Sequence, residues 1–441
     1  MAQSQAFWPT VYRVSMGFML VAAFAGRLHA QDQRARQNVV EPALQGDDQS
    51  ADDSPYRGTP RYEEPPPPPF DSVVPTWMPC QSLRTNRSLV LGHLYFGMDI
   101  MGWATKGVHA PPLVTSSSLA DGGVIGQGDT VVRFGDEFLQ NEMRPGGRLT
   151  IGWWFNPNQY TGIEWHYFEL DGANIRFNAA VTDGNSILAR PITNAGTGLN
   201  DAVIIGSDTQ NGSIRVASDM QLTSTGILLR DLLWSSPFAR LDYLVGYRHT
   251  HLYDRLRTDE SFTALAGNPD FSTGDRITRV DQFRTVNQFD GLDLGLKGWW
   301  SNNGKLAVTG LSKIAVGANN NNVIINGFTT THSGRTATTT NGGVLALPSN
   351  IGGRAQQQFG IVSEIGIGLE WQPVCLWKFN LGYTWFYWSE VARVLSQVDT
   401  TVDTSQLAPT NSSANCGCPG FHLHTTSFWA QGLNAGFTYQ F

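Results

Sequence analysis

Ten segments of this chain alternate apolar and polar residues, and the links between them are alternately short and long. The segments are 92–104, 147–156, 160–171, 220–234, 238–252, 287–301, 304–318, 357–372, 375–390 and 427–441. Tight turns such as NNG and QPV join every second pair, whereas the other links, 105–146, 172–219, 253–286, 319–356 and 391–426, have about 30–45 residues. Period-two alternation is typical of strands, and short turns that alternate with long loops are typical of outer-membrane barrels. The sequence therefore predicts an all-β fold, a closed antiparallel transmembrane β-barrel with long outer loops. It has ten strands, with 129–139 and 321–329 as hairpins that extend above the membrane, or twelve if these two stretches add a pair to the barrel.

The apolar residues of each segment share one strand face. In 238–252 that face holds Leu241, Tyr243, Val245 and Tyr247. Trp and Tyr gather near segment ends, as in KGWW and WFYW, which fits the aromatic girdles at the two membrane interfaces. A buried soluble core is the alternative, but it would require both faces of many long strands to be covered. We expect the apolar faces to contact lipid.

The last segment, SFWAQGLNAGFTYQF, alternates up to a C-terminal phenylalanine, Phe441. A closed barrel pairs its last strand with its first, so that no strand edge is exposed in lipid. Outer-membrane proteins commonly end in an aromatic residue that the barrel-assembly machinery recognises. We therefore expect Phe441 to act as the assembly signal, with outer-membrane lipids and that machinery as partners.

The N-terminal region divides into two further parts. Arg13 precedes an apolar run that ends at Gly26, and the small residue Ala30 follows, which predicts a signal peptide over 1–30. The run is too short for a transmembrane helix, which needs about 20 residues. Residues 31–90 include YEEPPPPPF and lack apolar periodicity, so we expect a disordered, Pro-rich periplasmic tail that is a spacer or a docking motif. The barrel would then occupy 91–441, in the cell outer membrane.

Charge and cysteine content restrict the partners and the cross-links. A net charge of -7 argues against a nucleic-acid partner. Of the four cysteines, Cys80 and Cys375 fall on the periplasmic side of the predicted barrel, and Cys416 and Cys418 fall in the last outer loop. The two pairs are separated by about 25 Å of apolar band, and a disulfide needs α-carbons within about 7 Å. We therefore expect Cys80 to pair with Cys375, and Cys416 to pair with Cys418 or to stay free or metal-bound.

Several ordered stretches resemble a planctomycete outer-membrane β-barrel family known as beta-barrel porin family seven. They are PPLVTSS (111–117), GVIGQ (123–127), VRFGDE (132–137), GGRLTIGWW (146–154), GIEWHYFEL (162–170), ILARP (187–191), ARLDYLVGYRHTHL (239–252) and FWAQGLNAGFTYQF (428–441). The resemblance covers about 95–441 and implies a signal-bearing outer-membrane barrel. It implies no catalytic residue and says little about cargo.

Strand parity places a set of ionisable residues opposite the apolar faces, toward the lumen. The set is Asp99, Arg148, Glu164, His166, Arg230, Arg240, Asp242, Arg248, Asp293, Lys297, Lys313, Glu364, Glu370 and Lys378. Ten strands predict a narrow or plugged lumen, since wide aqueous channels need about 16–18. The set is interpreted as a paired network that stabilises the barrel, with a charge-lined selective pore as the alternative.

Two groups of residues could form a protease site or a metal site. An omptin-like surface protease would use His249, His251 and Asp254 at the outer mouth, but the two histidines share the lipid-facing parity of Tyr247, so we predict no enzyme activity.

The stretch CGCPGFHLH offers two sulfurs and two imidazoles, but its C-x-C spacing is short for a zinc site, and we predict neither a metal nor another cofactor. The Asn- and Thr-rich stretches GANNNNVIINGF (317–328) and HSGRTATTTNGG (332–343) suit exposed loops.

The sequence thus predicts a porin-like outer-membrane barrel that passes small solutes or has a structural role in the envelope. The alternative is a surface adhesion or recognition protein that acts through its long loops.

Overall fold

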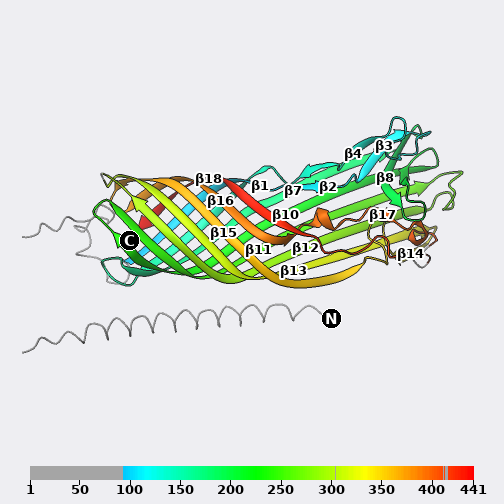
Figure 1. Cartoon of the computed structure of the whole chain (residues 1–441). Coiled ribbons are helices and arrows are strands. Elements are labelled where there is room, and N and C mark those ends of the chain that lie inside the picture. The colour runs from blue at the N-terminus through cyan, green and yellow to red at the C-terminus, as the bar shows by residue number, and fades with distance from the viewer. Residues whose placement is uncertain (1–92, 303, 411, 413–415) are drawn as a thin grey trace, which may run out of the picture. The chain divides into compact units, whose positions relative to one another are not determined.

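The computed structural model describes residues 93–441 except 303, 411 and 413–415. Its main feature is one closed sheet of ten antiparallel strands (Figure 1). The strands, in chain order, are β1 (Leu94–Thr105), β6 (Met143–Trp154), β7 (Thr161–Val181), β10 (Gln210–Ser235), β11 (Ala239–Ala264), β12 (Arg276–Trp300), β13 (Leu306–Ser333), β15 (Gly352–Val374), β16 (Trp377–Ala392) and β18 (Thr425–Gln440). Each strand pairs with the next, and β18 pairs with β1. The prediction of a closed ten-stranded barrel is confirmed.

The first and last strands close the ring over nearly the whole of β1. Their register runs from Tyr95 opposite Gln440 to Thr105 opposite Ala430. The backbone N–H of Phe441 donates to the carbonyl of Leu94 at 3.0 Å, so the terminal residue is part of the seam.

The twelve-strand alternative is wrong. Residues 129–139 form β4 (Val131–Phe134) and β5 (Glu137–Leu139), which pair with β3 (Val114–Ser118) and β2 (Val108–Ala110) outside the barrel sheet. Residues 321–329 belong to β13 itself. The Asn-rich stretch that looked like an exposed loop is therefore barrel strand.

Connections at the two ends of the barrel differ as predicted. Short turns at 155–160, 236–238, 301–305 and 375–376 lie at the end where β18 finishes, which we call the turn end. The other end, called the loop end, carries the long connections with β8 (Ser186–Asn194), β9 (Asn200–Gly206), β14 (Thr336–Asn341), β17 (Thr401–Val402) and the 3-10 helices η3 (Val394–Gln397) and η4 (Thr404–Gln406). Figure 1 shows several of these short strands gathered opposite the C-terminus.

Several strands extend much further toward the loop end than the sequence predicts. Three predicted links, 172–219, 253–286 and 319–356, are largely strand, and the second shrinks to 265–275. The 28 residues of β13 would span about 70 Å along the barrel axis at a rise of about 3.3 Å and a tilt of about 40°. An apolar band is about 25 Å tall, so most of this extension lies beyond the membrane.

The outward face shows where that band ends. On β11 it changes from Leu241, Tyr243 and Val245 near the turn end to Arg255 and Arg257 near the loop end. Exposed leucines and isoleucines of β12, β15 and β16 also lie toward the turn end. The lipid-facing band therefore surrounds the part of the barrel next to the short turns, which we call the turn half. The rest is the loop half. No helix in the described residues is long and apolar enough to cross a membrane.

The cysteines follow the expected division as far as they are described. Cys416 and Cys418 are joined by a disulfide at the loop end, with α-carbons 5.3 Å apart. Cys375, at a short turn, is also disulfide-bonded. Its expected partner Cys80, the predicted signal peptide and the predicted tail lie outside the described residues.

Candidate functional site: the barrel lumen

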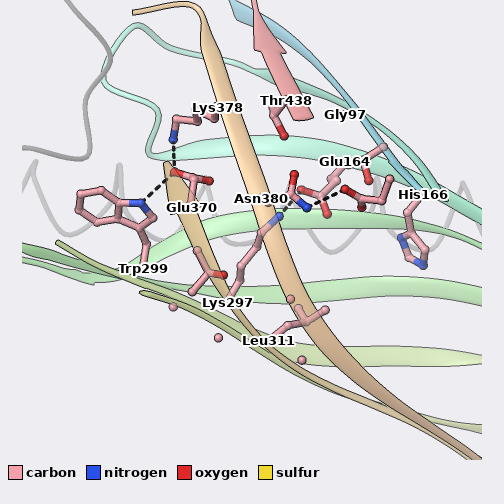
Figure 2. Close-up of a pocket in the computed structure, with 18 of the residues that line it drawn as sticks. Gly97, Glu164, His166, Lys297, Trp299, Leu311, Glu370, Lys378, Asn380 and Thr438 are labelled. Atoms are coloured by element: carbon pink, nitrogen blue, oxygen red, sulfur yellow. Dashed lines mark hydrogen bonds and ion pairs between the residues drawn. The ribbon is translucent and has the colours of Figure 1, made fainter. Parts of the chain in front are cut away.

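The turn half of the lumen contains a cavity of about 280 Å³, which we call the vestibule (Figure 2). Its lining includes Trp154, Gln159 and Gln440, which adjoin the short turns and the end of β18. It extends inward past Glu164 to His166 and Lys313. The vestibule is thus a polar chamber at the turn end.

Glycines on one wall make room for it. Gly366, Gly368 and Gly382 occupy inward positions of β15 and β16, where any larger residue would project into the lumen. A Cβ at Gly366 would approach no described heavy atom closer than the hydroxyl of Thr384 at 3.5 Å, which is ordinary contact.

The opposite wall is organised around Glu164. Its carboxylate accepts from the Tyr95 hydroxyl at 2.7 Å and from the Lys297 ammonium at 3.0 Å, and it lies 3.5 Å from the Arg230 guanidinium. A buried carboxylate needs such compensation, because removing a charge from water is costly unless partners replace the water.

Two arginines near the turn end share Asp242. Arg230 binds one of its oxygens at 2.6 Å and Arg240 binds the other at 2.7 Å. Both guanidiniums also lie against Trp154, at 4.7 and 4.8 Å from the ring centroid. This gives cation–π stabilisation in a desolvated place.

The inner end of the vestibule is a second charge cluster, centred on Glu364. This carboxylate binds Arg148 at 2.6 Å, Lys313 at 2.8 Å and Arg248 at 3.1 Å, and Arg248 also binds Asp293 at 2.8 Å. Arg248, Asp293 and Glu364 are at most 1% exposed. The cluster forms a floor across the lumen.

Smaller contacts complete the vestibule wall. Glu370 accepts from Lys378 at 2.9 Å and from the indole of Trp299 at 3.0 Å, and Asp99 accepts from Asn380 at 2.7 Å (Figure 2).

His166 differs from its neighbours. It is 4% exposed, and neither ring nitrogen has a hydrogen-bond partner among the described residues. Figure 2 shows the ring at the edge of the cavity with no marked contact. The structure thus places each of the fourteen ionisable residues selected from the sequence in the lumen, and thirteen of them make the contacts given above.

Beyond the floor the lumen is filled by apolar side chains. Trp103, Phe168, Phe386, Trp388 and Phe428 are all fully buried and belong to one cluster with Leu252 and Phe289. Phe168 packs edge-on against Phe386 at 5.6 Å between ring centroids, and Trp103 packs against Phe168 at 5.4 Å. We call this cluster the apolar layer.

A segment of the last long loop enters the lumen above that layer. Arg393, just before η3, is fully buried and donates to Asp254 at 3.0 Å and to the carbonyl of Lys106 at 3.1 Å. Asn287 on β12 both donates to the carbonyl of Ala392 and accepts from its N–H. Inward side chains of the barrel thus hold the segment in place.

The Asn-rich stretch of β13 binds the end of β16, just before that segment. Asn319 donates to the carbonyl of Ser389 at 2.7 Å and accepts from the indole of Trp388 at 2.8 Å. Asn321 donates to the carbonyl of Glu390 at 2.9 Å.

A second inserted loop, 344–347, is held by Asp281. Its carboxylate accepts backbone N–H groups of Val344, Leu345 and Ala346 at 2.9–3.2 Å. Arg190 from β8 binds Asp281 at 2.7 Å. Burial works to lower the pKa of Arg190, but the carboxylates of Asp281 and Glu260 outweigh it and raise that pKa.

These loop-half residues are not predicted from the sequence, because the predicted strands end too early. Continued alternation after 252 would have placed Asp254 and Glu260 on the inward parity of Arg248. No comparable signal marks Arg393 or Arg190, which reach the lumen from loops.

Residues considered for catalysis and metal binding are not assembled into sites. His249 faces outward and contacts Asp290 at 2.8 Å, whereas Asp254 faces inward and binds Arg393. The disulfide occupies both sulfurs of Cys416 and Cys418. No group of three or more His, Cys, Asp or Glu residues in the described part of the chain is arranged to hold a metal ion.

Comparisons with known proteins give one family match and several distant structural likenesses. The family model described as "Putative beta barrel porin-7 (BBP7)" matches residues 95–441. The outer membrane protease OmpT from Escherichia coli is 11% identical, with a TM-score of 0.38, over 81% of this chain and 99% of its own. The attachment invasion locus protein Ail of Yersinia pestis is 9% identical, with a TM-score of 0.17, over 79% and 99%. The toluene transporter TodX of P. putida is 8% identical, with a TM-score of 0.18, over 79% and 89%. No curated protein sequence matches the chain.

Proposed function

We propose, for a chain that belongs to the beta barrel porin-7 family, that this outer-membrane β-barrel protein has a structural role in the cell envelope and is closed to passive flow of solutes. The observation that carries the proposal is the apolar layer. Five aromatic side chains from β1, β7, β16 and β18 are fully buried across the lumen. A close-packed apolar interior contains few voids large enough for water.

The other parts of the lumen support closure. The charge floor on one side of the layer has Arg248, Asp293 and Glu364 paired with one another instead of with water. On the other side, 344–347 and Arg393 fill the loop half. An ion that crossed would have to displace both inserted segments and the aromatic contacts. We propose no catalytic step.

Planar-bilayer recording on the full chain tests the proposal. We expect no stable conductance steps, with insertion verified by protease protection of the barrel in the same membranes. The matched variant Phe168→Ala/Phe386→Ala thins the apolar layer alone and should also be silent, because the inserted loops still close the loop half. Stable steps of uniform size from the unaltered protein would refute a closed lumen and support passage of small solutes.

A second candidate role, surface recognition, rests on apolar side chains exposed at the loop end. Phe138 is 62% exposed, Met143 71% and Leu199 69%. Apolar side chains exposed on long connections, such as Phe138 and Leu199, are available for contact with a partner surface. Binding of cells that carry the protein to a host or abiotic surface should weaken with Phe138→Ser/Leu199→Ser if the loops act this way, and unchanged binding would remove this candidate.

We also propose that Phe441 is recognised during assembly. Its ring packs against Tyr439 at 4.9 Å between centroids, and its N–H completes the seam. Deletion of Phe441 should reduce the amount of folded barrel in outer membranes, while the same protein refolds in detergent. Normal amounts in membranes would contradict the proposal.

A further inference from the structure

We propose that the vestibule is a binding site for a small oxyanion of the size of phosphate, reached from the turn end. This goes beyond the structural role, because a chamber open at one end can bind a ligand whether or not the lumen conducts. The case rests on the cavity, on its excess of cationic side chains, and on a buried side chain without a partner.

Cations outnumber anions on the cavity wall. Six lining residues are Lys or Arg and four are Asp or Glu. Glu364 of the floor binds Lys313. The cationic side chains still outnumber the anionic ones when Glu364 is counted with the anions. A low-dielectric wall strengthens the attraction of such an excess for an anion.

The lysines keep donor capacity for a ligand. An ammonium group has three donors. Lys297 donates to Glu164 and Lys378 donates to Glu370, and each makes this one contact to an acceptor among the described residues. The Lys297 side chain is also 35% exposed, more than any other cation in the network, which leaves its ammonium accessible from the cavity.

Each acidic group on the cavity wall, in contrast, already has at least one donor in the protein. Glu164 already accepts from Tyr95 and Lys297, and Asp242 is shared by two arginines. A cation that entered the vestibule would compete with these donors for the carboxylates and would meet the excess of positive charge on the wall. The charge of the wall and the free N–H groups of the lysines therefore favour an anionic ligand, and phosphate offers oxygen acceptors in several directions.

His166 provides an independent observation. A buried polar group without a partner is costly, and such groups in native proteins need an explanation. An oxyanion at the inner end of the vestibule would supply the missing acceptor for one imidazole N–H. The neighbouring Lys313 would lie on the same side of that ligand, since both residues line the cavity.

Space and access fit a small ligand. The volume of about 280 Å³ admits a phosphate ion with several waters. The glycine wall keeps this space open, because Gly366, Gly368 and Gly382 present no side chain. Lipid headgroups do not reach a lumen site through the barrel wall, so a free anion is the expected ligand.

Isothermal titration of the full chain in a phosphate-free detergent, at constant ionic strength, tests the proposal with inorganic phosphate as the probe. We expect saturable binding, which Lys297→Gln and Lys378→Gln should each weaken about tenfold or more, since each removes a charge-assisted hydrogen bond. Gly366→Val should also weaken binding about tenfold, because it fills the cavity while keeping every charge.

Arg335→Gln is the matched control, because Arg335 is exposed in the turn between β13 and β14 and its loss changes the net charge equally. Its affinity should equal that of the unaltered protein. Absence of saturable binding, equal weakening by Arg335→Gln, or full affinity in Gly366→Val would overturn the proposal. Gly366→Val keeps the ion pairs, so it remains informative if a lysine variant fails to fold.

Discussion

The two halves of the barrel lumen are filled by different kinds of side chain. The turn half uses paired charges and small residues and retains a cavity between them. The loop half is packed like the interior of a soluble protein, with two inserted loop segments among buried apolar side chains. The difference shows that strand number alone does not decide whether a lumen is open. Residue volume at the inward positions decides it locally.

The largest expected effect is in the loop half, at Arg393. Arg393→Ala leaves Asp254 as a buried charge without its ion-pair partner, and such losses cost about 3–5 kcal/mol of unfolding free energy. Urea unfolding in lipid vesicles measures it. The matched control is Arg257→Ala on the outward face of β11, whose pair with Asp259 is more than one-third exposed on average and should contribute less than about 1 kcal/mol. Equal losses in both variants would contradict the description of the loop half as a buried core.

Two leucines on β11 compare the halves directly. Leu252 is fully buried in the apolar layer, whereas Leu244, 2% exposed, lines the vestibule. Leu252→Ala should lower the free energy of unfolding by about 3–5 kcal/mol, and Leu244→Ala by about 2 kcal/mol, because the space it vacates joins a chamber that admits water. The same unfolding assay applies, and a larger loss at Leu244 would reverse the comparison.

Substitution of a glycine by alanine should cost more stability in the packed loop half than in the vestibule. A Cβ at Gly317 would lie 2.1 Å from the carbonyl oxygen of Asp290, so Gly317→Ala should cost about 1–3 kcal/mol through backbone displacement. Gly366→Ala in the vestibule should change stability by less than about 1 kcal/mol, since its Cβ meets only ordinary contacts. Similar losses at both positions would mean that the vestibule is as tightly packed as the rest.

The smallest effect on stability is expected for peptide tags that test which end of the barrel faces the cell exterior. Peptide tags inserted at Gly196 and Gly334, both at the loop end, should be accessible to antibody on intact cells, and a tag at Asn302 in a short turn should not. These insertions should leave barrel stability nearly unchanged, because loop length affects closure entropy weakly. The opposite labelling pattern would invert the orientation.

The turn half could be predicted well from the sequence, because both the apolar lipid-facing residues and the period-two alternation are present there. Lipid requires an apolar outward face, so Leu241, Tyr243 and Val245 mark both the strand and its parity, and parity then places Arg240, Asp242 and Arg248 inside. Past the membrane the outward face becomes Arg255, Arg257 and Asp259, and the strand looks like a polar loop although its pairing continues.

The loop half could not be predicted in the same way. Val344 and Arg393 are buried by contacts with Asp281 and Asp254, which lie far away in the sequence. Asn319 and Asn321 have polar side chains that suit a loop, and only the register of β13 shows that they hold Ser389 and Glu390. The closure of the lumen depends on these long-range contacts, which no local period encodes.

Thiol labelling of single cysteines in the two halves tests the central claim most directly. Thr309→Cys places a thiol on the vestibule wall, and Thr250→Cys places a nearly isosteric thiol one inward position beyond Arg248, where Thr250 is fully buried. The three described native cysteines are disulfide-bonded, and the unaltered protein controls for any other reaction. With a charged, membrane-impermeant methanethiosulfonate present on both sides of the membrane, we expect rapid labelling at position 309 and at least about 100-fold slower labelling at position 250. Comparable rates at both positions would show that water and the reagent reach the part of the lumen described as packed, and this would contradict the closed lumen.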